Sequence, residues 1–254
     1  MLHTRTIGSG PHTWLALHGW SGSVETFEPL RRLLPADHRI IAVDLPGSGA
    51  SPSPAAWTRE HLDHALVQTI DAIDTPTLHL LGNCSGAILG LSAARLRPNR
   101  FDRVVIIDPF AFVPWYFQLF LTPIAGPIMY YSSFANPVGR WITNTALARH
   151  RTRDTDLTTS FYRVNHAAIL GTLRVLGEIG VIDSFAGVGR HHRILHGQRT
   201  FGAVRQSLPM WQALWPTADV IELKGAGHLP IQETTELLAR HTFDGPPSPT
   251  GAGQ

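Results

Sequence analysis

The single cysteine of this chain stands in a short run of small residues between an apolar segment and an Ala/Leu-rich one. The run is Gly82-Asn83-Cys84-Ser85-Gly86, with a strand predicted over 77–81 and a helix over 85–96. A Gly-x-nucleophile-x-Gly turn between a strand and a helix lifts its middle side chain above the sheet, and the positive helix end favours a thiolate. We therefore predict that Cys84 is a nucleophile, against the ordinary alternative of a small buried hydrophobic residue.

A base for the thiol proton is predicted late in the chain. His228 closes the segment Gly225-Ala226-Gly227-His228, after a predicted strand that ends at Leu223. Among the 14 histidines, it combines a glycine-rich loop with the chain order nucleophile, acid, histidine. His18 and His196 precede glycines and are expected to be structural, whereas the pair His191-His192 is expected at the surface or satisfied within the core.

The third group of such a site would be a carboxylate. Asp108 follows the apolar run 104–107, where a buried carboxylate could orient the imidazole and stabilise imidazolium. The alternative role for Asp108 is a helix cap or a bond to the next turn, and Asp183 is the other candidate acid. The predicted oxyanion hole consists of the backbone N–H groups of Ser85 and Trp20.

Short apolar runs that alternate with amphipathic segments must position these groups. This rhythm predicts an α/β fold with a mostly parallel sheet and helices on both faces. The predicted strands are 13–17, 39–43, 77–81, 103–107, 192–195 and 219–223, and the predicted helices are 24–34, 59–73, 85–96, 203–214 and 233–241.

One long interval breaks this rhythm. Residues 110–185 contain no clear strand, several prolines and many aromatic residues, among them Trp115, Tyr116 and Phe117. We predict a helical lid with an aromatic inner face over the site, against a membrane-surface segment or ordinary helical packing. The predicted parts are thus core 1–109, lid 110–185, core 186–244 and a disordered tail 245–254.

Composition limits the possible functions. The net charge is +2 without a long basic run, which argues against nucleic-acid binding. No stretch approaches the roughly 18 apolar residues of a membrane span, and the N-terminus lacks the apolar run of a signal peptide, so we expect a cytoplasmic protein that does not associate with membranes. One cysteine allows neither an internal disulfide nor a cysteine-based structural zinc site, and we expect no cofactor and no metal.

Several separate motifs together resemble those of α/β-hydrolase-fold proteins. His18-Gly19-Trp20 resembles the fold's oxyanion loop, the segment 44–51 (DLPGSGAS) its D-x-P-G-x-G-x-S loop, and Gly225 to His228 its late G-x-G-H. The chain departs from the common pattern at Thr200, where many members carry the acid. Asp108 stands at the alternative position that some members use.

Among members with a cysteine nucleophile, the chain most resembles Dieckmann cyclases that release tetramic acids or pyridones. That resemblance implies a β-ketoacyl-aminoacyl thioester delivered by the phosphopantetheine of an acyl or peptidyl carrier protein, an acyl-Cys84 intermediate, carbon–carbon bond formation and an apolar small-molecule substrate. Arg149, Arg151 and Arg153 could meet an acidic carrier, although a solvated basic turn is the simpler interpretation.

Two other functions compete with ring closure. The same residues would serve a cysteine-dependent thioesterase or a lactone or ester hydrolase. Polyhydroxyalkanoate synthases share the cysteine elbow but are longer, and dienelactone hydrolases keep the acid after the later strand, where this chain has Thr200. A non-enzymatic ligand-binding protein on the same fold is the alternative from another class.

Overall fold

The computed structural model describes residues 1–180 and 182–244. Its centre is a seven-stranded sheet of order β1-β3-β2-β4-β5-β6-β7, in which β1 pairs antiparallel with β3 and all other pairs are parallel. The strands are β1 (Thr4–Gly8), β2 (His12–Leu17), β3 (His38–Val43), β4 (Leu78–Asn83), β5 (Phe101–Ile107), β6 (His191–Gly197) and β7 (Asp219–Leu223). The predicted α/β fold is confirmed.

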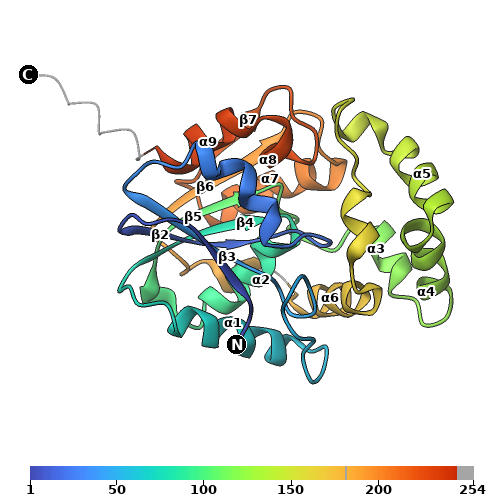
Figure 1. Ribbon diagram of the computed structural model, residues 1–254, viewed down its shortest axis with the longest axis horizontal. Coiled ribbons are helices and arrows are strands. Elements are labelled where there is room, and N and C mark those ends of the chain that lie inside the picture. The colour runs from blue at the N-terminus through green and yellow to red at the C-terminus, as the bar shows by residue number, and fades with distance from the viewer. Residues whose placement is uncertain (181, 245–254) are drawn as a thin grey trace, which may run out of the picture.

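Helices cover both faces of this sheet (Figure 1). One face packs against α1 (Arg59–Asp71), α2 (Ser85–Ala94) and α7 (Gly202–Leu214); the other packs against the 3-10 helix η1 (Val24–Arg32), α8 (Pro230–Glu233) and α9 (Thr235–Phe243). Because successive strand residues point to opposite faces, Leu80 joins the first core and Leu81 the second. This explains why the strands are apolar runs rather than alternating ones.

Two elements differ from the sequence prediction. The edge strand β1 was not predicted, because only Ile7 of its five residues is buried and its apolar signal is weak. The predicted α-helix over 24–34 is a 3-10 helix, and it contains Pro29, which has no N–H to donate to a helical bond.

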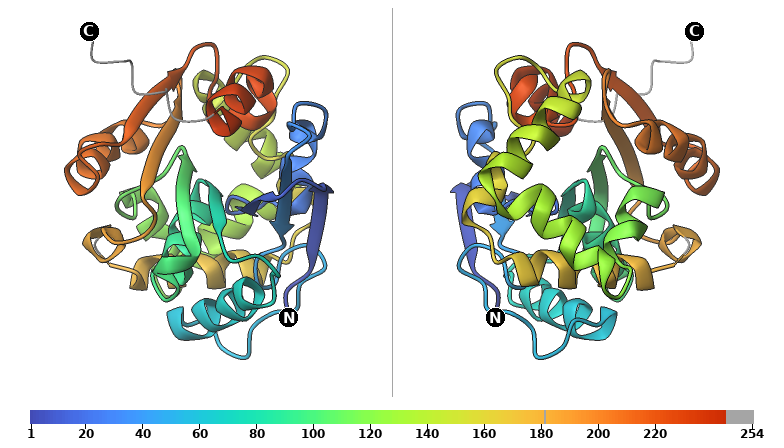
Figure 2. Two further views of the ribbon diagram at one scale, coloured as in Figure 1. Left: turned by 90° about the vertical axis from the view of Figure 1, so that its left-hand side faces the viewer. Right: turned by 90° about the vertical axis from the view of Figure 1, so that its right-hand side faces the viewer.

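In the described part of the interval 110–185, which leaves out residue 181, the chain forms helices and loops between β5 and β6. We call these residues the cap segment. They carry α3 (Trp115–Phe120), α4 (Ala125–Tyr130), the π-helix η3 (Tyr131–Ala135), α5 (Pro137–Ala146), the 3-10 helices η4 (Ala148–His150), η5 (Thr159–Arg163) and η6 (Ile182–Phe185), and α6 (His166–Glu178). A short 3-10 helix η2 (Pro98–Arg100) precedes β5. Figure 2, right, shows the cap helices in front of the sheet.

The cap segment has its own aromatic cluster. Tyr130, Phe134 and Phe161 are buried together with Ile169 and Leu170 of α6, and Trp20 of the core packs against them. The predicted boundaries of the lid and its covering role stay predictions. The predicted tail 245–254 lies outside the described residues.

Membrane spans were sought among the helices of the described residues. None of those helices combines the length and the apolar character that crossing a bilayer requires.

Candidate active site

Cys84 lies in a strained turn between β4 and α2. Its backbone has φ 51° and ψ −120°, a conformation that costs a non-glycine residue about 1–3 kcal/mol. Its N–H donates to the carbonyl of Ile107 at 2.8 Å, which ties the turn to the end of β5. Glycines allow this close packing, since a Cβ on Gly82 would lie 2.4 Å from Ala87 Cα and one on Gly86 2.2 Å from the His18 carbonyl oxygen.

Asp108 directly follows the last residue of β5 and is fully buried. It also has a positive φ of 47°, which turns the chain out of the sheet. Its Oδ2 accepts hydrogen bonds from His228 Nδ1 and Thr200 Oγ1, both at 2.8 Å, and its Oδ1 accepts one from the Gly197 N–H at 2.9 Å. These three donors compensate the buried carboxylate and fix the orientation of the imidazole.

The imidazole of His228 is largely but not fully buried, with 12% of its side chain exposed, and lies between Asp108 and the cysteine. Burial is the largest influence and lowers its pKa, but hydrogen bonds with Asp108 and with Cys84, together with their charges, outweigh it and raise the pKa of His228 to about 10. A protonated His228 can stabilise a thiolate on Cys84. A cysteine beside an imidazole that a carboxylate orients is an arrangement in which a thiol can act as a nucleophile.

The loop that carries His228 is fastened to the cap segment. The His228 N–H donates to the His150 carbonyl at 2.7 Å, and a Cβ on Gly227 would lie 2.2 Å from that carbonyl oxygen, which explains the glycine. Glu233 accepts from the N–H groups of Gly227 and Thr152, both at 2.6 Å. The same carboxylate thus holds the His228 loop and the cap segment together.

The loop that carries Trp20 is held by the buried His18. Its Nε2 accepts from the Leu45 N–H at 3.0 Å, so the Nδ1 carries the proton and donates to the Gly19 carbonyl at 2.8 Å. Burial lowers the pKa of His18, which keeps the ring neutral and suits these two bonds. His18 is therefore structural, as predicted.

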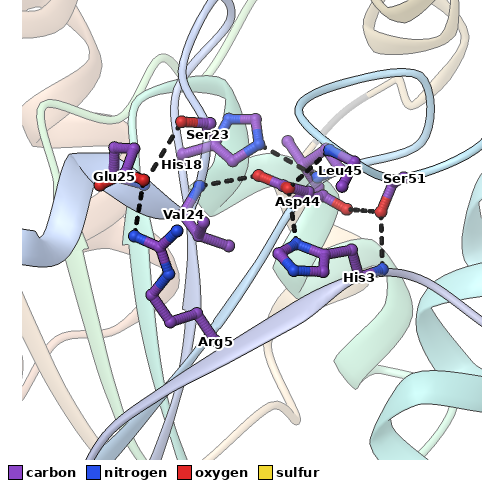
Figure 3. Close-up of polar contacts among 10 residues, drawn as sticks. His3, Arg5, His18, Ser23, Val24, Glu25, Asp44, Leu45 and Ser51 are labelled. Atoms are coloured by element: carbon purple, nitrogen blue, oxygen red, sulfur yellow. Dashed lines mark hydrogen bonds and ion pairs between the residues drawn. The ribbon is translucent and has the colours of Figure 1, made fainter.

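A second buried carboxylate anchors the loop that His18 meets (Figure 3). Asp44 accepts from the N–H groups of Val24 and Ala50 and contacts His3 Nδ1, at 2.8, 2.9 and 2.8 Å. Ser51 donates to the Asp44 carbonyl at 2.7 Å. A Cβ on Gly49 would lie 2.1 Å from the carboxylate, so this loop requires glycine there.

The backbone N–H groups predicted to form an oxyanion hole belong to residues that line one cavity. Ser85 is the first residue of α2, where a backbone N–H has no carbonyl partner within the helix. Trp20 faces it from the end of the β2 loop, and its indole N–H donates to the Ile169 carbonyl of α6 at 2.9 Å. Trp20 thereby joins the site to the cap segment.

The cavity beside Cys84 is narrow and apolar. Its volume is about 50 Å³, well below that of a typical ligand pocket. Among its described lining residues, polar side-chain atoms come only from Cys84, Ser85 and Trp20. The others are Ile88, Phe110, Ala111, Phe112, Val113, Pro114, Phe117, Leu173, Leu176, Ile179, Gly180, Ile182 and Phe185.

Other predicted groups lie elsewhere. Asp183 is exposed on η6, and the carboxylate in contact with His228 is that of Asp108. Of the predicted basic turn, Arg149 and Arg153 are exposed, whereas the guanidinium of Arg151 donates to carbonyl groups of its own loop, including Thr155 at 2.7 Å.

Sequence reasoning missed two residues of this site. Thr200 was seen only as a missing acid, although it donates to the Asp108 carboxylate and lies 3.1 Å from His228 Nδ1. Glu233 gave no motif signal, because the cap-segment donors that it binds, Thr152 and Thr155, lie far away in the chain. A polar residue at the usual position of the acid was the one available clue to Thr200.

One group of possible metal ligands occurs in the described residues, far along β2 and β3 from Cys84. His12, Asp37 and His38 bring one ligand atom each within 4.8 Å of the others. However, His38 Nδ1 accepts a hydrogen bond from the Trp14 indole at 2.9 Å, so its Nε2 carries the proton and is not free to bind a metal. The cluster does not fit a metal site.

Comparison with known proteins gives relatives with several hydrolase names. A "Serine hydrolase-like protein" of Danio rerio is 29% identical over 103 residues, 39% of this chain and 32% of that protein. A 2-hydroxy-6-oxononadienedioate/2-hydroxy-6-oxononatrienedioate hydrolase of Dechloromonas aromatica (strain RCB) is 30% identical over 127 residues, 44% of this chain and 43% of that protein. The chain spans about a third of the length of the first curated relatives it matches.

Solved structures and a family model agree on the fold. The enol-lactonase from Burkholderia xenovorans LB400 superposes with a TM-score of 0.76 at 18% identity, covering 94% of each chain. The model of the alpha/beta hydrolase family matches residues 14–241, which include Cys84, Asp108 and His228. This protein therefore belongs to the alpha/beta hydrolase family.

Proposed function

We propose that this protein is an acyl-transfer enzyme in which Cys84 takes an apolar acyl group from an ester or thioester. The observation that carries the proposal is the position of Cys84. It occupies a strained elbow beside an apolar cavity, next to a histidine that the buried Asp108 orients. Family membership supports acyl chemistry, since all three side chains lie within the matched region.

The proposed first half-reaction forms an acyl-enzyme. His228 holds the proton that Cys84 has lost, and the thiolate sulfur attacks the carbonyl carbon of the substrate. The N–H groups of Ser85 and Trp20 hold the resulting oxyanion, a contribution of about 10²–10³ in rate for each donor. Collapse re-forms the carbonyl, breaks the bond to the leaving group and passes the proton from His228 to that group.

Hydrolysis is the first candidate for the second half-reaction. Water would lose a proton to His228 and attack the acyl-Cys84 thioester, releasing a carboxylic acid and the thiol. The hydrolase and lactonase names of the relatives support this candidate.

Ring closure, as in a Dieckmann cyclase, is the second candidate. His228 would take the acidic proton between the two carbonyls of a β-ketoacyl-aminoacyl group, and the carbon would attack the thioester, forming a C–C bond and expelling the Cys84 thiolate. Two observations favour it. The nucleophile is cysteine, whose thioester is a good electrophile toward carbon, and the apolar cavity wall offers few groups to hold a competing water.

The mass of the product separates the two candidates. A synthetic β-ketoacyl-aminoacyl thioester is incubated with the wild-type protein and with Cys84→Ala. Hydrolysis gives an acid one water heavier than the ring, whereas cyclisation gives the substrate minus the thiol. Either product requires Cys84, so equal product from Cys84→Ala would refute the acyl-enzyme.

A carrier protein as the donor of the acyl group is a further proposal. Arg149 and Arg153 are the exposed cations of the cap segment turn that could meet an acidic carrier. Reversing both charges should slow turnover of a carrier-bound substrate while sparing a small thioester, and equal loss on both would end the docking proposal.

A further inference from the structure

The side chain of Ser85 has a feature that its backbone role does not explain. Ser85 is 5% exposed, and its hydroxyl has no hydrogen-bond partner among the described residues. A buried polar group without a partner destabilises the fold, and native proteins contain few of them. Ser85 is one of the residues that line the cavity beside Cys84, so a ligand in this cavity would lie next to the residue that carries this hydroxyl.

Among the described residues, the surroundings of that hydroxyl supply no hydrogen-bond partner, so a ligand could provide one. The cavity wall within the described residues is otherwise apolar, apart from Cys84 and the indole of Trp20. The indole N–H is already used, because it donates to the Ile169 carbonyl. Alanine would suit such a wall better than serine unless a substrate supplied the missing partner.

The position of Ser85 limits where that partner can be on the substrate. The hydroxyl and the proposed oxyanion donor belong to the same residue, next to the proposed nucleophile. When the reacting carbonyl is attached to Cys84 with its oxygen at the Ser85 N–H, rotation about the Cα–Cβ bond of Ser85 would bring the hydroxyl toward atoms close to that carbonyl. A serine hydroxyl both donates and accepts, so an amide or an oxygen substituent would satisfy it.

We propose that Ser85 is a specificity-determining residue that hydrogen-bonds a polar substituent on the carbon next to the reacting carbonyl, in an acyl group that is otherwise apolar. This inference rests on the proposed acyl transfer through Cys84 and narrows its substrate to N-acylaminoacyl or similarly substituted acyl groups. The remainder of the acyl chain meets Phe117, Leu173 and Leu176 and carries no charge.

The kinetic test compares two N-acetylcysteamine thioesters of the same chain length. N-hexanoylglycyl carries an amide next to the reacting unit, and nonanoyl carries none. The ratio of their kcat/KM values should fall about 3- to 10-fold in Ser85→Ala, the effect of one neutral hydrogen bond. Ser92→Ala is the matched control, because Ser92 is a buried serine of the same helix whose hydroxyl already accepts from Arg59 at 3.3 Å, and it should keep the wild-type ratio.

A binding test separates this inference from the proposed function. Cys84→Ala and the double variant Cys84→Ala/Ser85→Ala are titrated with N-hexanoylglycinamide and with nonanamide, and Kd is measured calorimetrically. The preference for the glycinamide should drop by the same 3- to 10-fold when Ser85 is lost. An unchanged preference in both tests would overturn the role of Ser85, whereas a lost preference without turnover by the wild type would overturn the acyl transfer alone.

Discussion

Asp108 binds three donors, and two of them, His228 and Thr200, meet at the same oxygen. Thr200 thus supports the carboxylate rather than replacing it as the acid. Removing a donor from a buried carboxylate destabilises the fold, because the carboxylate is left with too few hydrogen bonds. Thr200 is therefore a positioning residue that acts through Asp108.

Substitution of these two residues should give graded effects. Thr200→Val should lower kcat/KM about 3- to 30-fold, whereas Thr200→Ser, which keeps the hydroxyl, should restore most of it. Asp108→Asn should cost about 10²–10⁴, because the imidazole loses its orienting charge. Steady-state kinetics on a small thioester measure both, with thermal unfolding as the check on folding. Wild-type rates in Thr200→Val would show that this hydrogen bond does not position the acid.

At the scale of elements, the most consequential link joins the His228 loop to the cap segment. Glu233 accepts from Gly227 and Leu229 on one side and from Thr152 and Thr155 on the other. All four donors face carboxylate oxygens, so this position requires two acceptor atoms. A displacement of the cap segment would therefore pull on these hydrogen bonds and shift the loop that carries His228.

Glu233→Gln should weaken this link. The glutamine NH₂ group would face donors, which destabilises the fold by about 1–3 kcal/mol and lowers Tm by about 3–10 °C, with a fall in kcat. The matched control is Glu236→Gln, an exposed glutamate one turn further along the chain, which should leave both unchanged. Equal behaviour of the two variants in differential scanning calorimetry and in kinetics would contradict the link.

Much of this framework follows from sequence patterns, and the exceptions have physical causes. The strands that carry Cys84 and Asp108 are buried on both faces and give strong apolar runs. The edge strand β1 gives almost none, and Pro29 alters the type of η1. Cys84, Asp108 and His228 were recognisable because each occupies a local pattern. Glu233 and the role of Thr200 were not, because their contacts join segments far apart in the chain.

For the whole molecule, the ionisation of His228 couples the site to stability. Folding raises the pKa of His228 from 6.5 to about 10. A group with a raised pKa binds its proton more tightly in the folded state, so it stabilises the fold fully below about pH 6.5. That contribution is lost as the pH rises through about 10.

His228→Gln should reveal this dependence. The Tm difference between wild type and variant should be largest below pH 6.5 and should shrink steadily toward pH 10, because only the wild type carries the titrating imidazole. Thermal unfolding across this range measures it, with His191→Gln, an exposed histidine, as the control. A Tm difference that stays constant with pH would contradict the charged, Asp108-bound state of His228.

In the proposed mechanism, Cys84 carries the acyl group during turnover. The most direct measurement is acid-quenched mass spectrometry of the whole protein after brief mixing with an excess of N-hexanoylglycyl thioester. We expect the wild type to gain the mass of the acyl group, on the peptide that contains Cys84, and Cys84→Ala to gain nothing. Equal labelling of both proteins, or an acyl group on another residue, would contradict the account.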